Sequence, residues 1–126
     1  MPENPSIPAS QRAFLLPECG GPAHLTDNYP VIQPSELQSG QCLVKLTFSG
    51  VCHSDLGIKN GNFPNKPKKD LIGGHEGIGT VVAIAANTPS NKLIKVGSRV
   101  GLKFLATACF NCDLCLKGFE GRKQCP

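Results

Sequence analysis

The sequence predicts one mainly β domain, and three observations support this fold class. The chain has 126 residues, a length that suits one domain, and 40% of them are apolar, which is enough for a hydrophobic core. Fourteen glycines and eleven prolines lie in short clusters, as expected of brief strands joined by turns. Several segments of strand length alternate between apolar and polar residues, and nothing resembles an internal repeat or a coiled coil.

The N-terminal part of the chain predicts a tail followed by a short strand. Residues 1–12 contain three prolines and no apolar region of a secretory signal, so we expect a mobile tail there. The apolar run at 13–16 precedes Pro17 and suits an opening strand. Residues 19–22 then predict a turn.

The clearest local signal is a half-buried strand over 41–49, where every second residue is apolar: Cys42, Val44, Leu46 and Phe48. Gly50 interrupts it, and Ser54 or Asp55 can cap a short helix that ends by Gly61. The apolar run at 81–85 predicts a buried strand, followed by a turn-rich segment at 87–91. Alternation over 99–104 predicts a further strand that leads into a cysteine-rich loop.

Composition excludes several classes of function. The formal charge is +4, no run of five basic residues occurs, and the chain has no Trp and one Tyr, which argues against nucleic-acid binding. No apolar run approaches the roughly 20 residues that cross a bilayer. Seven cysteines without a signal peptide indicate metal binding or free thiols in a reducing compartment, and therefore the cytosol.

Four cysteines near the C-terminus form the strongest motif: Cys109, Cys112, Cys115 and Cys125. Tetrahedral Zn²⁺ accepts four thiolates at about 2.3 Å each, so the spacing predicts a structural zinc site. One alternative is an iron–sulfur cluster, because the ferredoxin motif also contains a close cysteine triplet and a later Cys-Pro. In that motif three residues precede the fourth cysteine, whereas nine do so here. The remaining alternative is a set of buried or free thiols.

Two further segments place metal-binding and acid–base side chains among glycines or at a strand end. Residues 73–77 put His75 and Glu76 between glycines, and residues 52–55 follow the strand predicted over 41–49. Taken singly, each residue has an ordinary structural interpretation. Cys52 suits a core thiol, Ser54 a helix cap and Asp55 a first-turn carboxylate.

In their order along the chain, these motifs resemble those of the zinc-dependent medium-chain alcohol dehydrogenases, closest to the yeast and fungal type. The motifs are residues 49–56, residues 73–77 and the four cysteines. The resemblance extends from about residue 13 to the end of the chain, and three motifs in one order are highly specific. It implies that residues 13–126 form a GroES-like, partly open β-barrel with short helices. Residues 109–125 would be its structural-zinc lobe.

The resemblance also implies roles for the metal-binding residues. Cys52 and His75 would be ligands of a catalytic zinc, and Glu76 its neighbouring or alternative ligand. Asp55 matches the carboxylate that orients the ligating histidine. A catalytic zinc keeps three protein ligands and one open position, and its ligands usually have such outer partners.

Two residues beside these ligands match the family's proton and cofactor contacts. Ser54 matches the hydroxyl that receives the alcohol proton, and His53 faces the cofactor pyrophosphate. The implied activity is oxidation of primary or secondary alcohols to aldehydes or ketones, by hydride transfer to NAD(P). Zinc would act as a Lewis acid that lowers the pKa of the bound alcohol towards about 7.

The sequence departs from the family pattern at several points. The 126 residues stop before the position of the family's third catalytic ligand, and they do not include the family's Rossmann domain. We therefore expect a fragment, a truncated gene model or a degenerate non-catalytic zinc-binding paralogue, inactive alone.

Single residues also differ from the family pattern. Gly57 replaces a histidine that passes the proton to solvent, so we expect either a shorter proton relay or His53 as the proton acceptor. Phe63 and Phe104 replace pocket tryptophans, so either the pocket accepts alcohols larger than ethanol or both rings pack in the core. Family members assemble into homo-oligomers.

Overall fold

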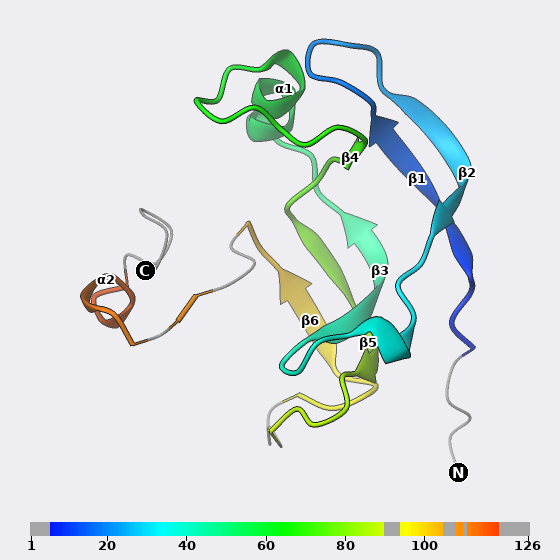
Figure 1. Cartoon of the computed structure of the whole chain (residues 1–126), viewed down its shortest axis with the longest axis vertical. Helices are drawn as coiled ribbons and strands as arrows, with labels where there is room; N and C mark the ends of the chain where they lie inside the picture. The colour runs from blue at the N-terminus through cyan, green and yellow to red at the C-terminus, as the bar shows by residue number, and fades with distance from the viewer. Residues whose placement is uncertain (1–5, 90–93, 105–107, 110, 119–126) are drawn as a thin grey trace.

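The described residues of the computed structural model form two three-stranded antiparallel sheets (Figure 1). The model describes residues 6–89, 94–104, 108–109 and 111–118. The first sheet has the order β2-β1-β4, with β1 at Ser10–Leu16, β2 at His24–Pro30 and β4 at Leu71–Ile72. The mainly β prediction is confirmed. The first strand begins at Ser10, three residues before the predicted start of the domain.

The second sheet has the order β3-β5-β6, with β3 at Cys42–Ser49, β5 at Gly77–Ile84 and β6 at Arg99–Leu102. All three overlap predicted strands, although β5 begins four residues before the run predicted over 81–85. The central strand, β5, carries half of the buried apolar residues and is paired with a neighbour along each edge. The buried apolar residues are Ala13, Leu16, Val81, Val82, Ala83 and Ala85.

The predicted burial of β3 is wrong at three positions. Cys42, Leu46 and Phe48 were expected on a buried face, yet all three are exposed, Leu46 by 53% and Phe48 by 68%. Irregular pairing between β3 and β5 occurs at residues 43–44 and 46–48, so the side chains of β3 do not alternate regularly between two faces. The prediction for β6 is also too long, because the strand ends at Leu102, before Phe104.

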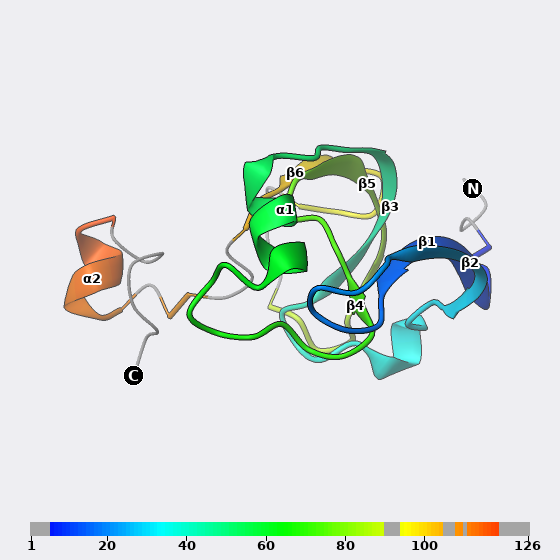
Figure 2. The ribbon, with the colours of Figure 1, turned by 90° about the horizontal axis from the view of Figure 1, so that it is seen from above.

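Three helical segments connect or follow the strands. They are the 3-10 helix η1 at Pro34–Glu36, α1 at His53–Asn60 and α2 at Asp113–Leu116. α1 lies between β3 and β4 along the chain, and α2 lies to one side of the two sheets (Figures 1 and 2). Within the described segments, no helix combines the length and the apolar character needed to cross a membrane.

Candidate metal centre

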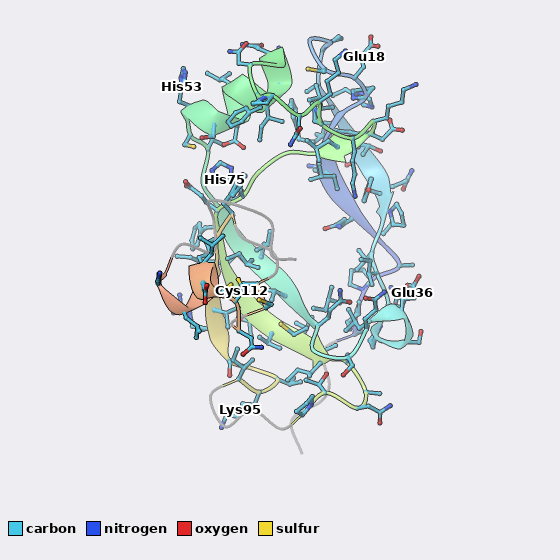
Figure 3. All side chains as sticks on the ribbon, turned by 60° about the vertical axis from the view of Figure 1, so that its left-hand side comes forward. Glu18, Glu36, His53, His75, Lys95 and Cys112 are labelled. Atoms are coloured by element: carbon cyan, nitrogen blue, oxygen red, sulfur yellow. The ribbon has the colours of Figure 1, made fainter. Side chains whose placement is uncertain are left out.

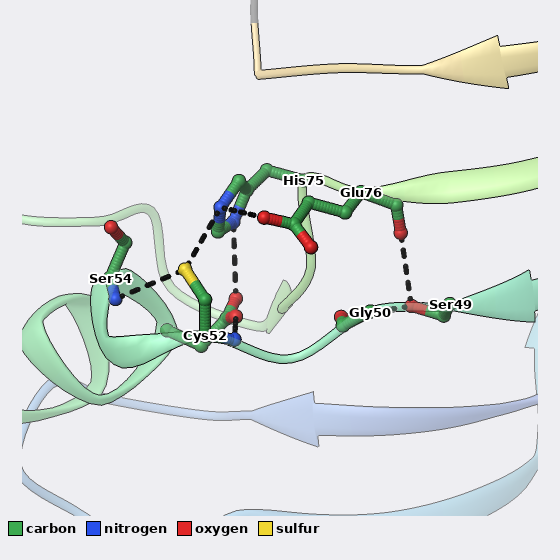
Figure 4. A network of polar contacts seen from close by, with 7 residues as sticks. Ser49, Gly50, Cys52, Ser54, His75 and Glu76 are labelled. Atoms are coloured by element: carbon green, nitrogen blue, oxygen red, sulfur yellow. Dashed lines mark hydrogen bonds and ion pairs between the residues drawn. The ribbon is translucent and has the colours of Figure 1, made fainter.

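The pairing of β3 with β5 brings two of the predicted motifs together. Ser49, the last residue of β3, lies opposite Gly77, the first residue of β5. The segment after β3 leads into α1, and the segment before β5 carries His75 and Glu76. Residues 49–55 and 73–77 therefore meet at one end of the sheet (Figure 4).

Cys52 is the residue that caps α1. Its sulfur accepts the backbone N–H of Ser54 at 3.3 Å, and its own N–H donates to Oδ2 of Asp55 at 2.8 Å. This corrects the prediction that Ser54 or Asp55 is the cap, although Asp55 does lie in the first turn as expected. The reciprocal pair of bonds is a capping box in which a thiol takes the place of the usual hydroxyl. The cap fixes the position of the Cys52 sulfur.

The two ring nitrogens of His75 face different partners. Nε2 lies 3.4 Å from the Cys52 sulfur and 3.6 Å from Oε1 of Glu76 (Figure 4). Nδ1 lies 3.3 Å from Oδ1 of Asp55. A single ion cannot contact both nitrogens, so an ion bound by the sulfur of Cys52 would be bound by Nε2. Asp55 then serves the opposite nitrogen, as the predicted orienting carboxylate requires.

Asp55 is suited to remain ionised beside His75. The N–H of Cys52 donating to the carboxylate lowers the pKa of Asp55 below its usual value, and the nearby imidazole of His75 adds to this effect. Burial opposes the shift without reversing it. Oδ1 of Asp55 and Nδ1 of His75 are both buried and have no hydrogen-bond partner among the described residues. A small rotation would pair them, which leaves Nε2 as the free donor atom for a metal.

The donor set fits a zinc ion. The ligand atoms of Cys52, Asp55 and His75 lie within 4.8 Å of one another, and a thiolate with an imidazole is a donor pair that zinc favours. The carboxylate of Glu76 lies at the exposed edge of the same group, with half of its side chain exposed.

The structure does not bring His53 into this group. His53 is exposed on α1, and its side chain points away from His75 (Figure 3). Ser54 contributes its backbone N–H to the sulfur of Cys52.

A cavity of about 560 Å³ lies beside His75 and is lined largely by apolar side chains of β1, β4 and α1. Phe104 lines it and meets the ring of His75 edge-on, with ring centroids 5.6 Å apart. Phe63 does not line it, because its ring packs over Gly57 in α1. The two phenylalanines predicted as a pair therefore have different environments. Phe104, which is 67% exposed, does not pack in the core.

Three of the four C-terminal cysteines form a second group. Cys112 precedes α2 and Cys115 lies within it, so one turn of helix brings their sulfurs together with that of Cys109. The sulfurs of Cys109 and Cys115 are 3.8 Å apart, which equals the edge of a tetrahedron with zinc–sulfur distances of about 2.3 Å. This spacing fits one tetrahedral ion. Cys125, the predicted fourth ligand, lies outside the described residues.

Sequence reasoning did not identify the structural importance of Gly50. Its N–H donates to the carbonyl of Glu76 at 3.2 Å, and the hydroxyl of Ser49 donates to the same carbonyl at 3.3 Å. A glycine directly after a strand and two residues before a predicted ligand was the available signal.

The sequence is similar to a known family model and to known proteins. Residues 38–125 match the model of the alcohol dehydrogenase GroES-like domain. An alcohol dehydrogenase from Geobacillus stearothermophilus is 47% identical over 89 residues, which cover 71% of this chain and 25% of that protein. An alcohol dehydrogenase from Schizosaccharomyces pombe is 38% identical over 116 residues, which cover 91% of this chain and 31% of that protein.

A solved structure gives the same result at the level of the fold. The zinc-dependent alcohol dehydrogenase 2 from Streptococcus pneumonia, in its apo form, superposes with a TM-score of 0.63 at 30% identity. The superposition covers 86% of this chain and 29% of that one. The chain thus spans less than a third of the length of each of these relatives.

Proposed function

This chain belongs to the family of alcohol dehydrogenase GroES-like domains, and from this premise we propose that Cys52 and His75 hold the catalytic zinc of an alcohol dehydrogenase. The observation that carries the proposal is the division of the His75 nitrogens, with Nε2 3.4 Å from the Cys52 sulfur and Nδ1 3.3 Å from Asp55. The reaction is oxidation of a primary or secondary alcohol to an aldehyde or ketone, with hydride transfer to NAD(P).

Each residue of the site has a chemical task in this proposal. Asp55 keeps the proton of the imidazole on Nδ1, so that Nε2 presents its lone pair. Glu76 lies beside the same nitrogen as a neighbouring or alternative ligand. When bound, zinc supplies Lewis acidity that makes the alcohol hydroxyl more acidic. Ser54 receives the hydroxyl proton while it passes its own proton on towards solvent, and the exposed His53 contacts the cofactor pyrophosphate.

We further propose that the second cysteine group holds a structural zinc. The 3.8 Å separation of the Cys109 and Cys115 sulfurs supports one tetrahedral ion, and Cys125 is the proposed fourth ligand. Such a site needs reduced thiols, which supports a cytoplasmic location. The proposed partners of the whole protein are a small alcohol or aldehyde, NAD(P) and further copies of itself in a homo-oligomer.

Activity can be tested in the full length of a relative. The 116 matched residues of the Schizosaccharomyces pombe alcohol dehydrogenase are replaced by those of this chain, and formation of reduced nicotinamide is followed with a series of alcohols. We expect alcohol-dependent reduction of NAD(P). The substitution Cys52→Ser should lower it by about a hundredfold or more, because the metal loses a thiolate ligand.

The control is Cys42→Ser, which changes an exposed cysteine in β3 and should leave activity unchanged. A chimaera that folds, contains zinc and reduces neither cofactor with any alcohol would contradict the proposed function. Visible absorption typical of an iron–sulfur cluster in the metal-loaded chain would contradict the proposed zinc sites.

A further inference from the structure

The carboxylate of Glu76 rests in a space that exists only because residue 50 is glycine. A Cβ atom built on Gly50 would collide with Oε2 of Glu76 and would lie 3.2 Å from Cβ and 3.4 Å from Cδ of the same side chain. Gly50 is not among the residues with positive φ, so its backbone conformation is open to other amino acids. The glycine is therefore needed for close approach and not for conformation.

The backbone on both sides of this contact is fixed. The N–H of Gly50 donates to the carbonyl of Glu76 at 3.2 Å, and the hydroxyl of Ser49 donates to the same oxygen. Ser49 is also paired with Gly77 at the end of the β3–β5 ladder. A side chain at position 50 would consequently displace the Glu76 carboxylate, which is the flexible end of the contact. The 3.2 Å contact with Cβ of Glu76 needs a shift of only a few tenths of an ångström, so the ladder would stay in place.

We call the space beside Gly50 the seat of the Glu76 carboxylate. Its position matters because the other carboxylate oxygen faces His75. Oε1 of Glu76 is 3.6 Å from Nε2 of His75, the nitrogen that faces the Cys52 sulfur. The side chain of Glu76 is 51% exposed, so without a seat the carboxylate would extend into water. The space at Gly50 instead keeps the carboxylate beside the Cys52 sulfur and Nε2 of His75, the atoms that would face a metal ion.

We propose that Gly50 is a positioning residue for the Cys52–His75 metal site, which acts by seating the carboxylate of Glu76 beside Nε2 of His75. The proposal deepens the proposed function and rests on it. The proposal has a specific consequence. A side chain at position 50 should change metal binding only when the Glu76 carboxylate is present.

A double-mutant cycle tests this dependence. The purified chain is compared as Gly50→Ala, Glu76→Ala and the double variant, each titrated with Co²⁺. The absorption that Cys52→Ser abolishes reports the Cys52–His75 site. We expect Gly50→Ala to weaken Co²⁺ binding about tenfold, and Glu76→Ala to do the same. In the double variant the affinity should equal that of Glu76→Ala, because Oε2 and Cδ are gone and only the 3.2 Å contact with Cβ of residue 76 remains.

Gly101→Ala is the matched control, since a Cβ there meets no atom within 4 Å and the residue lies in the neighbouring strand β6. A Gly50→Ala chain that binds Co²⁺ like the unmodified chain, or effects that multiply in the double variant, would overturn the proposal.

A metal-free measurement distinguishes failure of this proposal from failure of the proposed function. Nuclear Overhauser contacts between the Gly50 Hα and Glu76 Hγ protons are expected, and their absence refutes the seat itself. Absence of any Cys52-dependent Co²⁺ absorption in the unmodified chain refutes the metal site.

Discussion

One carboxylate orients both residues that face each other in the metal centre. Asp55 accepts the N–H of Cys52 through Oδ2, which fixes the start of α1, and its Oδ1 faces Nδ1 of His75. The lowered pKa keeps this carboxylate charged at neutral pH, so it favours a proton on Nδ1 and a free lone pair on Nε2. The arrangement joins the thiol and the imidazole through one carboxylate that contacts both residues.

The substitution Asp55→Asn should therefore weaken metal binding without removing a ligand. We expect the affinity of the Cys52–His75 site for Co²⁺ or Zn²⁺ to fall by about ten- to a hundredfold, because an uncharged amide no longer holds the proton on Nδ1. Competition with a chelating dye measures the change. Asp27→Asn, an exposed position in β2 beside Arg12, is the control. An affinity within about twofold of the unmodified chain would argue against the orienting role.

At the scale of elements, α1 has an end that the sequence indicates, a start that the structure corrects, and a packing contact that the sequence does not reveal. The helix begins after Cys52 and ends at Gly61, which has a left-handed backbone conformation as expected of a C-terminal glycine. In its middle, Gly57 is buried under Phe63, and a Cβ at that position would lie 2.8 Å from Cε2 of the ring. The ring thus covers the site where the related enzymes were expected to place a relay histidine.

This contact predicts that one substitution has opposite effects in two backgrounds. Gly→Ala inside a helix ordinarily stabilises by about 0.5–1 kcal/mol. Here Gly57→Ala should lower the free energy of unfolding by about 1–3 kcal/mol, because the added methyl group overpacks against Phe63. In a chain that also carries Phe63→Ala, Gly57→Ala should raise the free energy of unfolding. Urea unfolding followed by circular dichroism measures both values, and the same sign in both backgrounds would exclude the proposed coupling.

Elements with little periodicity escaped prediction. β2 has the polar sequence His-Leu-Thr-Asp-Asn-Tyr-Pro and lies at an edge of its sheet, where polar and proline residues are tolerated. β4 has two residues, too few for any alternation to be visible. In contrast, β5 was evident from its apolar run, because a central strand is buried on both faces.

At the scale of the whole molecule, the two cysteine-containing groups lie in different parts of the fold. Cys52 and His75 meet at one end of the β3–β5 ladder. Cys112 and Cys115 instead lie at the start of the short α2 and within it, and α2 lies to one side of both sheets (Figures 1 and 2). The first group draws its atoms from two distant segments of the chain, and the second draws its atoms from a single loop. The two should therefore bind metal independently.

Zinc titration of the chain should reveal one tight and one weaker site. Four cysteines are proposed for the first, against two ligands and the neighbouring Glu76 for the second. Cys112→Ser should remove the tight phase, and Cys52→Ser should remove only the weak phase. Competition with chelators of graded affinity distinguishes these phases. Two equally tight zincs in the unmodified chain would show that Glu76 or another residue completes the second site.

The chemistry of this chain was determined by the sequence itself, because metal ligation depends on residue type and local spacing. The close spacing of Cys109, Cys112 and Cys115 illustrates this. The Cys-His-Ser-Asp motif at 52–55 and the His-Glu motif at 75–76 do so as well. Only the tertiary structure decided that Nε2 of His75 faces Cys52, that Asp55 serves both residues, and that Gly50 makes room for Glu76. The physical reason is the register of β3 against β5. Pairing of Ser49 with Gly77 joins residues that are 28 positions apart in the sequence, and packing of the sheet sets that register.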